Sequence, residues 1–144
     1  MEVTVNRLKH SYAVACCMRD IVQRHPEDYA CSPEDMYILG MLHDIGYAFV
    51  EHQPDHAHAG GLALKRQGYR YWREVYYHSI PQEEYDSAEL RLLNYADITT
   101  GPDGNPMTMQ ERIDNIILRY GKGSLQEQKA VKMRDQILSY GIKI

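Results

Sequence analysis

The stretch SPEDMYILGMLHDIG (residues 32–46) begins with strong helix-start signals and ends soon after the polar pair His43-Asp44. Ser32 is a good N-cap, Pro33 suits the first helical turn, and the acidic residues that follow suit the helix dipole. The run between them is apolar, which favours a buried helix. The polar pair therefore stands at the end of an apolar element, where polar groups need partners.

Helix signals dominate the rest of the chain, and no run alternates with a period of two for long. A helix over 4–24 should end at His25-Pro26, because the residue before a proline avoids helical angles. The other expected helices cover 33–46, 55–67, 70–78, 84–99, 108–120 and 124–140, with a loop over 47–55. Capping-box patterns at Thr108 and Ser124 open the last two. The sequence thus predicts an all-α single domain over 1–144 with six or seven helices. Its core is expected over about 4–100 and covering helices over about 105–144.

Composition excludes several classes of protein. The 144 residues carry 16 Lys+Arg and 20 Asp+Glu, a formal net charge of −4, so a strongly basic nucleic-acid footprint is absent. The three cysteines form no C-x-x-C pair, which favours reduced thiols over a disulfide framework. No stretch of about 18 apolar residues is present, and MEVTVNRLKH has no apolar signal region. We expect a cytoplasmic protein without a membrane span.

Three polar side chains lie on otherwise apolar helix stripes: His10, His43 and Asp97. Asp44 adds a fourth group of the same kind. A buried carboxylate costs several kcal/mol unless it is paired or binds a metal. The convergence of four such groups from three helices favours a metal site, and mixed imidazole and carboxylate ligands suit a divalent transition metal.

Each of these residues alone has an ordinary explanation. A single histidine on an apolar face is more often a hydrogen-bonded core residue. Asp97 could cap a helix, or could pair with an arginine such as Arg91 or Arg112. The absence of a thiolate among the four groups disfavours a structural zinc site.

The order of these residues, His10, then His43-Asp44 followed by Ile-Gly, then Asp97, resembles the H…HD…D pattern of the HD-domain phosphohydrolase superfamily. The layout is similar to the bacterial dinuclear HD hydrolases of dinucleoside tetraphosphates and to related HDIG-type hydrolases. The resemblance implies hydrolysis of a phosphate ester or anhydride of a nucleotide or other small phosphorylated metabolite by metal-activated hydroxide. It implies that His43 and Asp44 are catalytic.

The resemblance also implies one or two divalent ions (Fe, Mn, Co, Ni, Zn or Mg) and a set of ligands. The first ion would be held by His10, His43, Asp44 and Asp97, and the second by His56 and His78 with Asp44 bridging. Spacing alone does not separate His56 from His58, although His56 fits the register of the family.

Basic residues after the second-metal histidine are candidates for phosphate contacts. They are Lys65, Arg66, Arg70 and Arg73. The alternative for each is a solvated helix face. Many HDIG proteins carry a lysine directly after the glycine, where this chain has Tyr47. Tyr47 could donate a hydrogen bond to substrate, stack on a base, or pack on the loop. His52 could support a metal ligand or contact the substrate, but it is interpreted as an exposed loop histidine.

Two other functions are compatible with these residues. One is a non-catalytic regulatory HD module that binds a metal or nucleotide. The other is a mixed-valence diiron HD oxygenase. For partners, we expect a small phosphorylated substrate and no nucleic acid. The C-terminal helices carry no candidate catalytic group, and a homodimer contact is compatible with their pattern.

Overall fold

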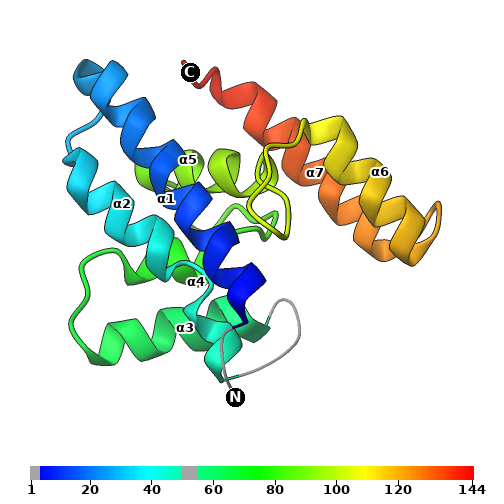
Figure 1. Cartoon of the computed structure of the whole chain (residues 1–144), viewed down its shortest axis with the longest axis horizontal. Coiled ribbons are helices and arrows are strands. Elements are labelled where there is room, and N and C mark those ends of the chain that lie inside the picture. The colour runs from blue at the N-terminus through cyan, green and yellow to red at the C-terminus, as the bar shows by residue number, and fades with distance from the viewer. Residues whose placement is uncertain (1–3, 50–54) are drawn as a thin grey trace.

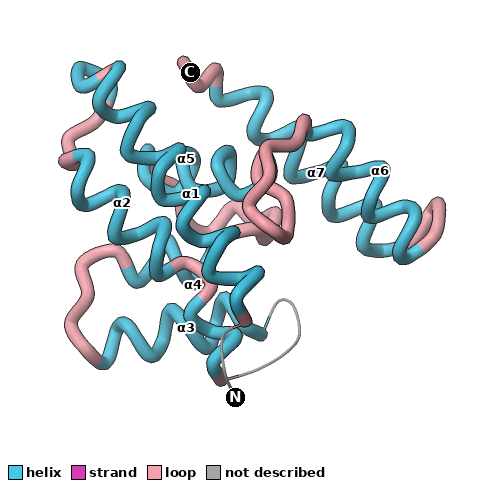
Figure 2. Tube along the Cα trace, viewed as in Figure 1, coloured by secondary structure: helices cyan, strands magenta, loops and turns pink. Residues whose placement is uncertain are grey.

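The computed structural model describes residues 4–49 and 55–144 (Figure 1). These residues form seven α-helices and two short 3₁₀ turns, with no strand among them, which confirms the all-α class (Figure 2). The elements are α1 (Val5–Arg24), η1 (Pro26–Asp28), α2 (Pro33–Leu42), η2 (Ile45–Ala48), α3 (Asp55–Arg66), α4 (Trp72–Tyr77), α5 (Ala88–Ile98), α6 (Met109–Tyr120) and α7 (Leu125–Tyr140).

Helices α1 and α2 lie side by side and supply much of the core (Figure 1). Thr4 and Ser32 cap them, each side chain accepting a hydrogen bond from a backbone N–H in the first turn. The two helices approach closely at Gly40, where an added Cβ would overlap the Cα of Ala15. Because the backbones touch there, the ends of the two helices that carry His10 and His43 come together.

Helix α2 ends at Leu42, four residues before the predicted end at Gly46. The ring of His43 explains this difference. Its Nδ1 lies 2.6 Å from the carbonyl oxygen of Gly40, the acceptor that the next helical N–H would use. The chain then turns into η2, so the predicted loop over 47–55 begins inside a 3₁₀ turn.

The η2 turn packs directly on α3 through glycine. A Cβ at Gly46 would overlap the carbonyl group of His56, and one at Gly60 would lie 2.9 Å from the backbone nitrogen of Gly46. Only residues without side chains permit this approach. It brings the polar pair after α2 against the first turn of α3.

Helix α5 begins at Ala88 with Ser87 as its N-cap, later than the predicted start at 84. The Oε1 atom of Gln82 accepts from the backbone N–H groups of Glu84 and Tyr85, at 2.6 and 2.8 Å. These local bonds hold the segment in a turn and compete with helix formation.

The α6–α7 hairpin extends to one side of the bundle (Figure 1). Its helices start at the predicted caps, with a complete capping box at Thr108. Ile137 and Met133 of α7 pack with Ile98 of α5, whereas Leu138 is 61% exposed. None of the described helices combines the length and apolar character needed to span a membrane.

Candidate metal centre

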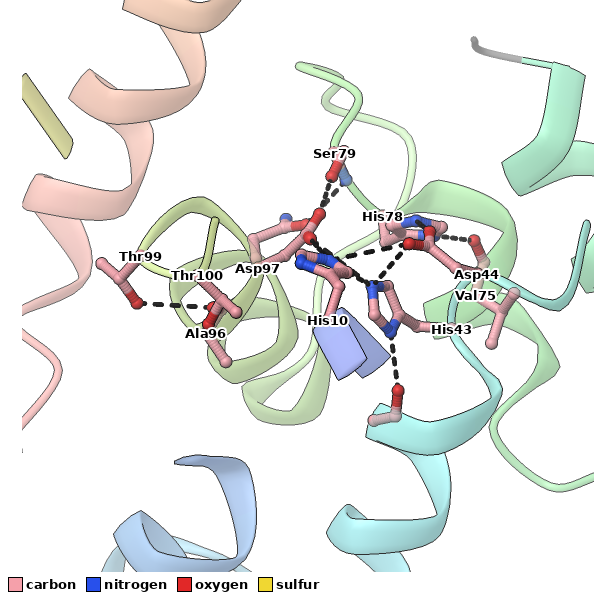
Figure 3. A network of polar contacts seen from close by, with 12 residues as sticks. His10, His43, Asp44, Val75, His78, Ser79, Ala96, Asp97, Thr99 and Thr100 are labelled. Carbon is pink, nitrogen blue, oxygen red and sulfur yellow. Dashed lines mark hydrogen bonds and ion pairs between the residues drawn. The ribbon is translucent and has the colours of Figure 1, made fainter. Parts of the chain in front are cut away.

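Six imidazole and carboxylate side chains from five parts of the fold converge inside the bundle. Figure 3 labels all of them except His56. His10 lies on α1, and His43 and Asp44 follow the end of α2. His56 lies on the first turn of α3, His78 directly follows α4, and Asp97 lies on α5. All six are buried. These are the six residues that the sequence analysis assigned to metal binding.

Asp44 lies between two pairs of imidazoles. Its Oδ1 is 3.2 Å from Nε2 of His56 and 3.3 Å from Nε2 of His78. Its Oδ2 is 3.3 Å from Nε2 of His43 and 3.6 Å from Nε2 of His10. Each oxygen of the Asp44 carboxylate therefore faces its own pair of imidazoles.

Asp97 faces the pair on α1 and α2. Its Oδ1 lies 2.8 Å from Nε2 of His10 and 3.4 Å from Nε2 of His43. Its Oδ2 accepts a hydrogen bond from the hydroxyl of Ser79. Ser79 adopts a left-handed conformation with φ of 61°, and its N–H donates to Asn94 at 2.8 Å. The segment after α4 thus fixes the orientation of this carboxylate.

Both arginines considered as partners of Asp97 bind elsewhere. Arg91 pairs with Asp86 at 2.6 Å, and Arg112 donates to the carbonyl of Thr100 at 2.9 Å. The pairing of Asp97 with an arginine is therefore wrong, and the imidazoles are its neighbours.

Backbone carbonyls set the tautomer of three of the histidines. Nδ1 of His10 lies 2.9 Å from the oxygen of Gly101, and Nδ1 of His43 and of His78 lie 2.6 Å from carbonyls three residues earlier. A carbonyl oxygen only accepts, so each Nδ1 is the donor and each neutral ring turns its Nε2 lone pair to the centre. Nε2 of His10 and Nε2 of His43 are 3.3 Å apart. Two lone pairs at that distance repel unless a cation lies between them.

The charged groups in the centre shift one another's pKa values. Burial lowers the pKa of His43, but the carboxylates of Asp44 and Asp97 outweigh burial and hold it well above its ordinary value. Burial raises the pKa of both carboxyls, but the neighbouring imidazoles outweigh it and keep both values well below normal. Burial lowers the pKa of His56. The carboxylates are ionised, and a metal that binds the imidazoles would displace their protons. This set of donors therefore suits a metal ion.

The geometry and the chemistry of the donors both fit a divalent metal. Three overlapping groups of ligand atoms each lie within 4.8 Å of one another. They are His10–His43–Asp44, His43–His78–Asp97 and Asp44–His56–His78. Imidazole with carboxylate is the donor mixture that transition metals such as Mn and Fe accept.

The structure separates the two histidines of α3. His56 is fully buried, with its Nε2 at the Asp44 carboxylate, whereas His58 is part-buried and stacks on Tyr76 with ring centroids 4.3 Å apart. His56 is therefore the one at the centre, as the family register indicated. His52 lies outside the described residues.

The basic residues proposed to contact phosphate lie around the end of α3 and the start of α4. Lys65 and Arg73 both lie over the ring of Trp72, at 4.7 and 4.5 Å. Arg70 lies over Tyr71 at 5.0 Å, and Arg66 is exposed. Their role in substrate binding stays a prediction.

Tyr47 lies at the edge of the centre, together with an arginine that the sequence analysis did not select. The Tyr47 ring stacks on His56 with centroids 4.1 Å apart, and the guanidinium of Arg7 lies 3.3 Å from the Tyr47 centroid. Arg7 precedes His10 by three positions and so shares its helix face, which is the signal that could have identified it. Ser79 was also missed, because nothing local in the sequence indicates its left-handed backbone.

Comparison with models of protein families finds a match to the HD domain over residues 7–101. This range is more than half of the chain, and it contains all six residues of the centre. Searches of curated proteins and of solved structures found no significant match.

Proposed function

The chain belongs to the HD domain family, and from this premise we propose that it is a metal-dependent phosphohydrolase. Members of this family are generally metal-dependent hydrolases. The observation that supports this function is the arrangement of three imidazoles, each fixed through Nδ1 by a carbonyl, with Nε2 directed at two buried carboxylates. Buried carboxylates need an opposite charge beside them, and a cation bound among these imidazoles would supply it.

The substrate that we propose is a phosphate ester or anhydride of a nucleotide or another small phosphorylated metabolite. Because the order of these residues resembles that of dinuclear HD hydrolases, a dinucleoside tetraphosphate is one member of this class to test. When bound, a divalent ion lowers the pKa of a water molecule and polarises a phosphoryl oxygen.

The protein residues have distinct tasks in this proposal. His10, His43 and Asp97 would hold one ion, and His56 and His78 would hold a second. The two oxygens of Asp44 lie 3.2–3.6 Å from four imidazole nitrogens of both groups, so this carboxylate would belong to both ligand sets and would orient a water molecule beside them. Burial around the centre excludes bulk water and strengthens each electrostatic contact.

The test measures bound metal and phosphate release from a panel of nucleotides and sugar phosphates, with Mn, Fe, Co, Ni and Mg supplied in turn. Asp44→Asn keeps the shape of the side chain but removes its charge, and should abolish turnover and lower the bound metal. Asp86→Asn removes an exposed carboxylate that pairs with Arg91, and serves as the matched control. Full turnover in Asp44→Asn would contradict the proposal.

The other two functions give different results in the same experiment. Metal binding without cleavage of any phosphorylated compound would favour a regulatory module. Oxygen consumption by the iron-loaded protein, without phosphate release, would favour a diiron oxygenase. Either result would replace the phosphohydrolase proposal.

A further inference from the structure

A three-layer stack joins α1, η2 and α3 at the edge of the metal centre. The guanidinium of Arg7 lies 3.3 Å from the centroid of the Tyr47 ring, and the imidazole of His56 lies 4.1 Å from it with an interplanar angle of 15°. Two planar groups so close to one centroid cannot share a face of the ring. Tyr47 is therefore held between Arg7 and His56, and a base could stack on it only by displacing Arg7.

The stack fixes where the positive charge of Arg7 lies. Arg7 lies on the first turn of α1, where its backbone N–H donates a hydrogen bond to Oγ1 of Thr4 at 3.2 Å. It precedes His10 on the same helix face. The guanidinium is thus anchored on a ring that is itself anchored on a residue of the centre.

The donors of Arg7 remain available to an anion. Among residues 4–49 and 56–144, no carboxylate forms an ion pair with its guanidinium, and the side chain is only part-buried. A guanidinium that lies flat on an aromatic ring keeps its in-plane N–H groups for hydrogen bonds, and their fork matches two oxygens of a phosphate.

We propose that Arg7 binds the phosphoryl group of the substrate at the metal centre, with Tyr47 as the platform that positions its guanidinium. This inference rests on the proposed function and adds a substrate-binding residue to it. The phosphoryl oxygens that face away from the metal ions would accept hydrogen bonds from Arg7. A fixed cation beside the reacting group stabilises the negative charge that develops during phosphoryl transfer.

The experiment uses inorganic phosphate as the probe and the full-length protein loaded with the divalent ion that it binds most tightly. Phosphate affinity is measured by titration calorimetry, so the readout does not depend on turnover. Arg7→Met removes the charge but keeps a flexible side chain over Tyr47, and Arg7→Lys keeps the charge without the planar fork. Lys9→Met is the matched control, because Lys9 is an exposed cation on the same turn of α1.

Arg7→Met should bind the metal normally and bind phosphate roughly 10- to 100-fold more weakly, the usual effect of losing a hydrogen bond to a charged group. Arg7→Lys should keep part of the affinity, and Lys9→Met should stay within about twofold of the wild type, because exposed charges are screened. Equal phosphate affinity in the wild type and Arg7→Met, an equal loss in Lys9→Met, or an Arg7→Lys variant no better than Arg7→Met would each overturn the assignment.

The two proposals can fail separately. Phosphate binding that depends on Arg7, in a protein that hydrolyses no phosphorylated compound, would support the role of Arg7 in anion binding and refute the hydrolase. Hydrolysis with unchanged phosphate affinity in Arg7→Met would support the hydrolase and refute the role of Arg7.

Discussion

Gly40→Ala tests how the close contact of α1 and α2 forms the metal centre. A Cβ at this position would overlap the Cα of Ala15 and lie 2.7 Å from its backbone nitrogen. Alanine in a helix is favoured over glycine by about 1 kcal/mol, whereas overpacking a core costs about 1–3 kcal/mol. Backbone atoms cannot rotate out of the way as a flexible side chain can, so we expect an overpacking cost of about 2–3 kcal/mol.

The expected result is a net loss of about 1–2 kcal/mol in the free energy of unfolding, since the two contributions oppose each other. For a chain of this length this lowers the melting temperature by roughly 3 °C per kcal/mol. The clash would also push α1 from α2 and separate Nε2 of His10 from Nε2 of His43, now 3.3 Å apart. Metal affinity should therefore fall together with stability.

The assay is urea unfolding with a chelator present, followed by a metal titration of the folded protein. Ile38→Ala is the control on the same helix, because Ile38 is 47% exposed and its truncation should change stability by less than about 0.5 kcal/mol. Adding Ala15→Gly to Gly40→Ala should not restore stability, because the clashing nitrogen and Cα remain. A Gly40→Ala protein more stable than the wild type would refute the reasoning.

Three further changes probe the surroundings of the centre. Ser79→Ala should lower the free energy of unfolding by about 1–2 kcal/mol and weaken metal binding, because Asp97 loses a buried hydrogen bond. Ser79→Gly should unfold at a higher urea concentration than Ser79→Ala, because glycine tolerates the φ of 61°. Tyr85→Phe removes the hydroxyl that donates to the buried Glu74 at 2.5 Å and should cost about 1.5–3 kcal/mol in urea unfolding; no change would show that this bond contributes nothing. In metal-free protein, the raised pKa of His43 gives stability that is complete below its ordinary value of 6.5 and is lost as the pH rises through the raised value. The lowered pKa values of the two carboxylates give stability that is present above 3.8 and is lost as the pH falls through the lowered values. Unfolding measured across this range should therefore show metal-free protein losing stability towards alkaline pH, and bound metal should suppress that loss; equal alkaline profiles with and without metal would contradict it.

The helices were predictable where local chemistry decides them. Ser32 with Pro33 predicted the start of α2, and Thr108 and Ser124 predicted the starts of the last two helices, because capping depends on neighbours in the sequence. The end of α2 was not predictable from propensity. It depends on a ring nitrogen of His43 taking the carbonyl of Gly40, a competition that the apolar pattern does not report.

Part of the candidate centre was predictable because His10, His43 and Asp97 stand out as polar residues on apolar helix stripes, whereas His56 and His78 were selected only through the resemblance to HD proteins. The pattern selected His10 and Asp97, which lie 87 positions apart in the sequence and 2.8 Å apart in space. Arg7 and Ser79 were not selected, since each acts through a tertiary contact. The guanidinium of Arg7 needs Tyr47 from another element, and the hydroxyl of Ser79 needs a backbone angle that serine seldom adopts.

The most direct test of the metal centre is a crystal structure with diffraction data collected on both sides of the absorption edges of the candidate transition metals. We predict at least one anomalous peak within bonding distance of Nε2 of His10, Nε2 of His43 and the carboxylates of Asp44 and Asp97. Crystals grown with these metals that show no peak among these side chains would contradict it.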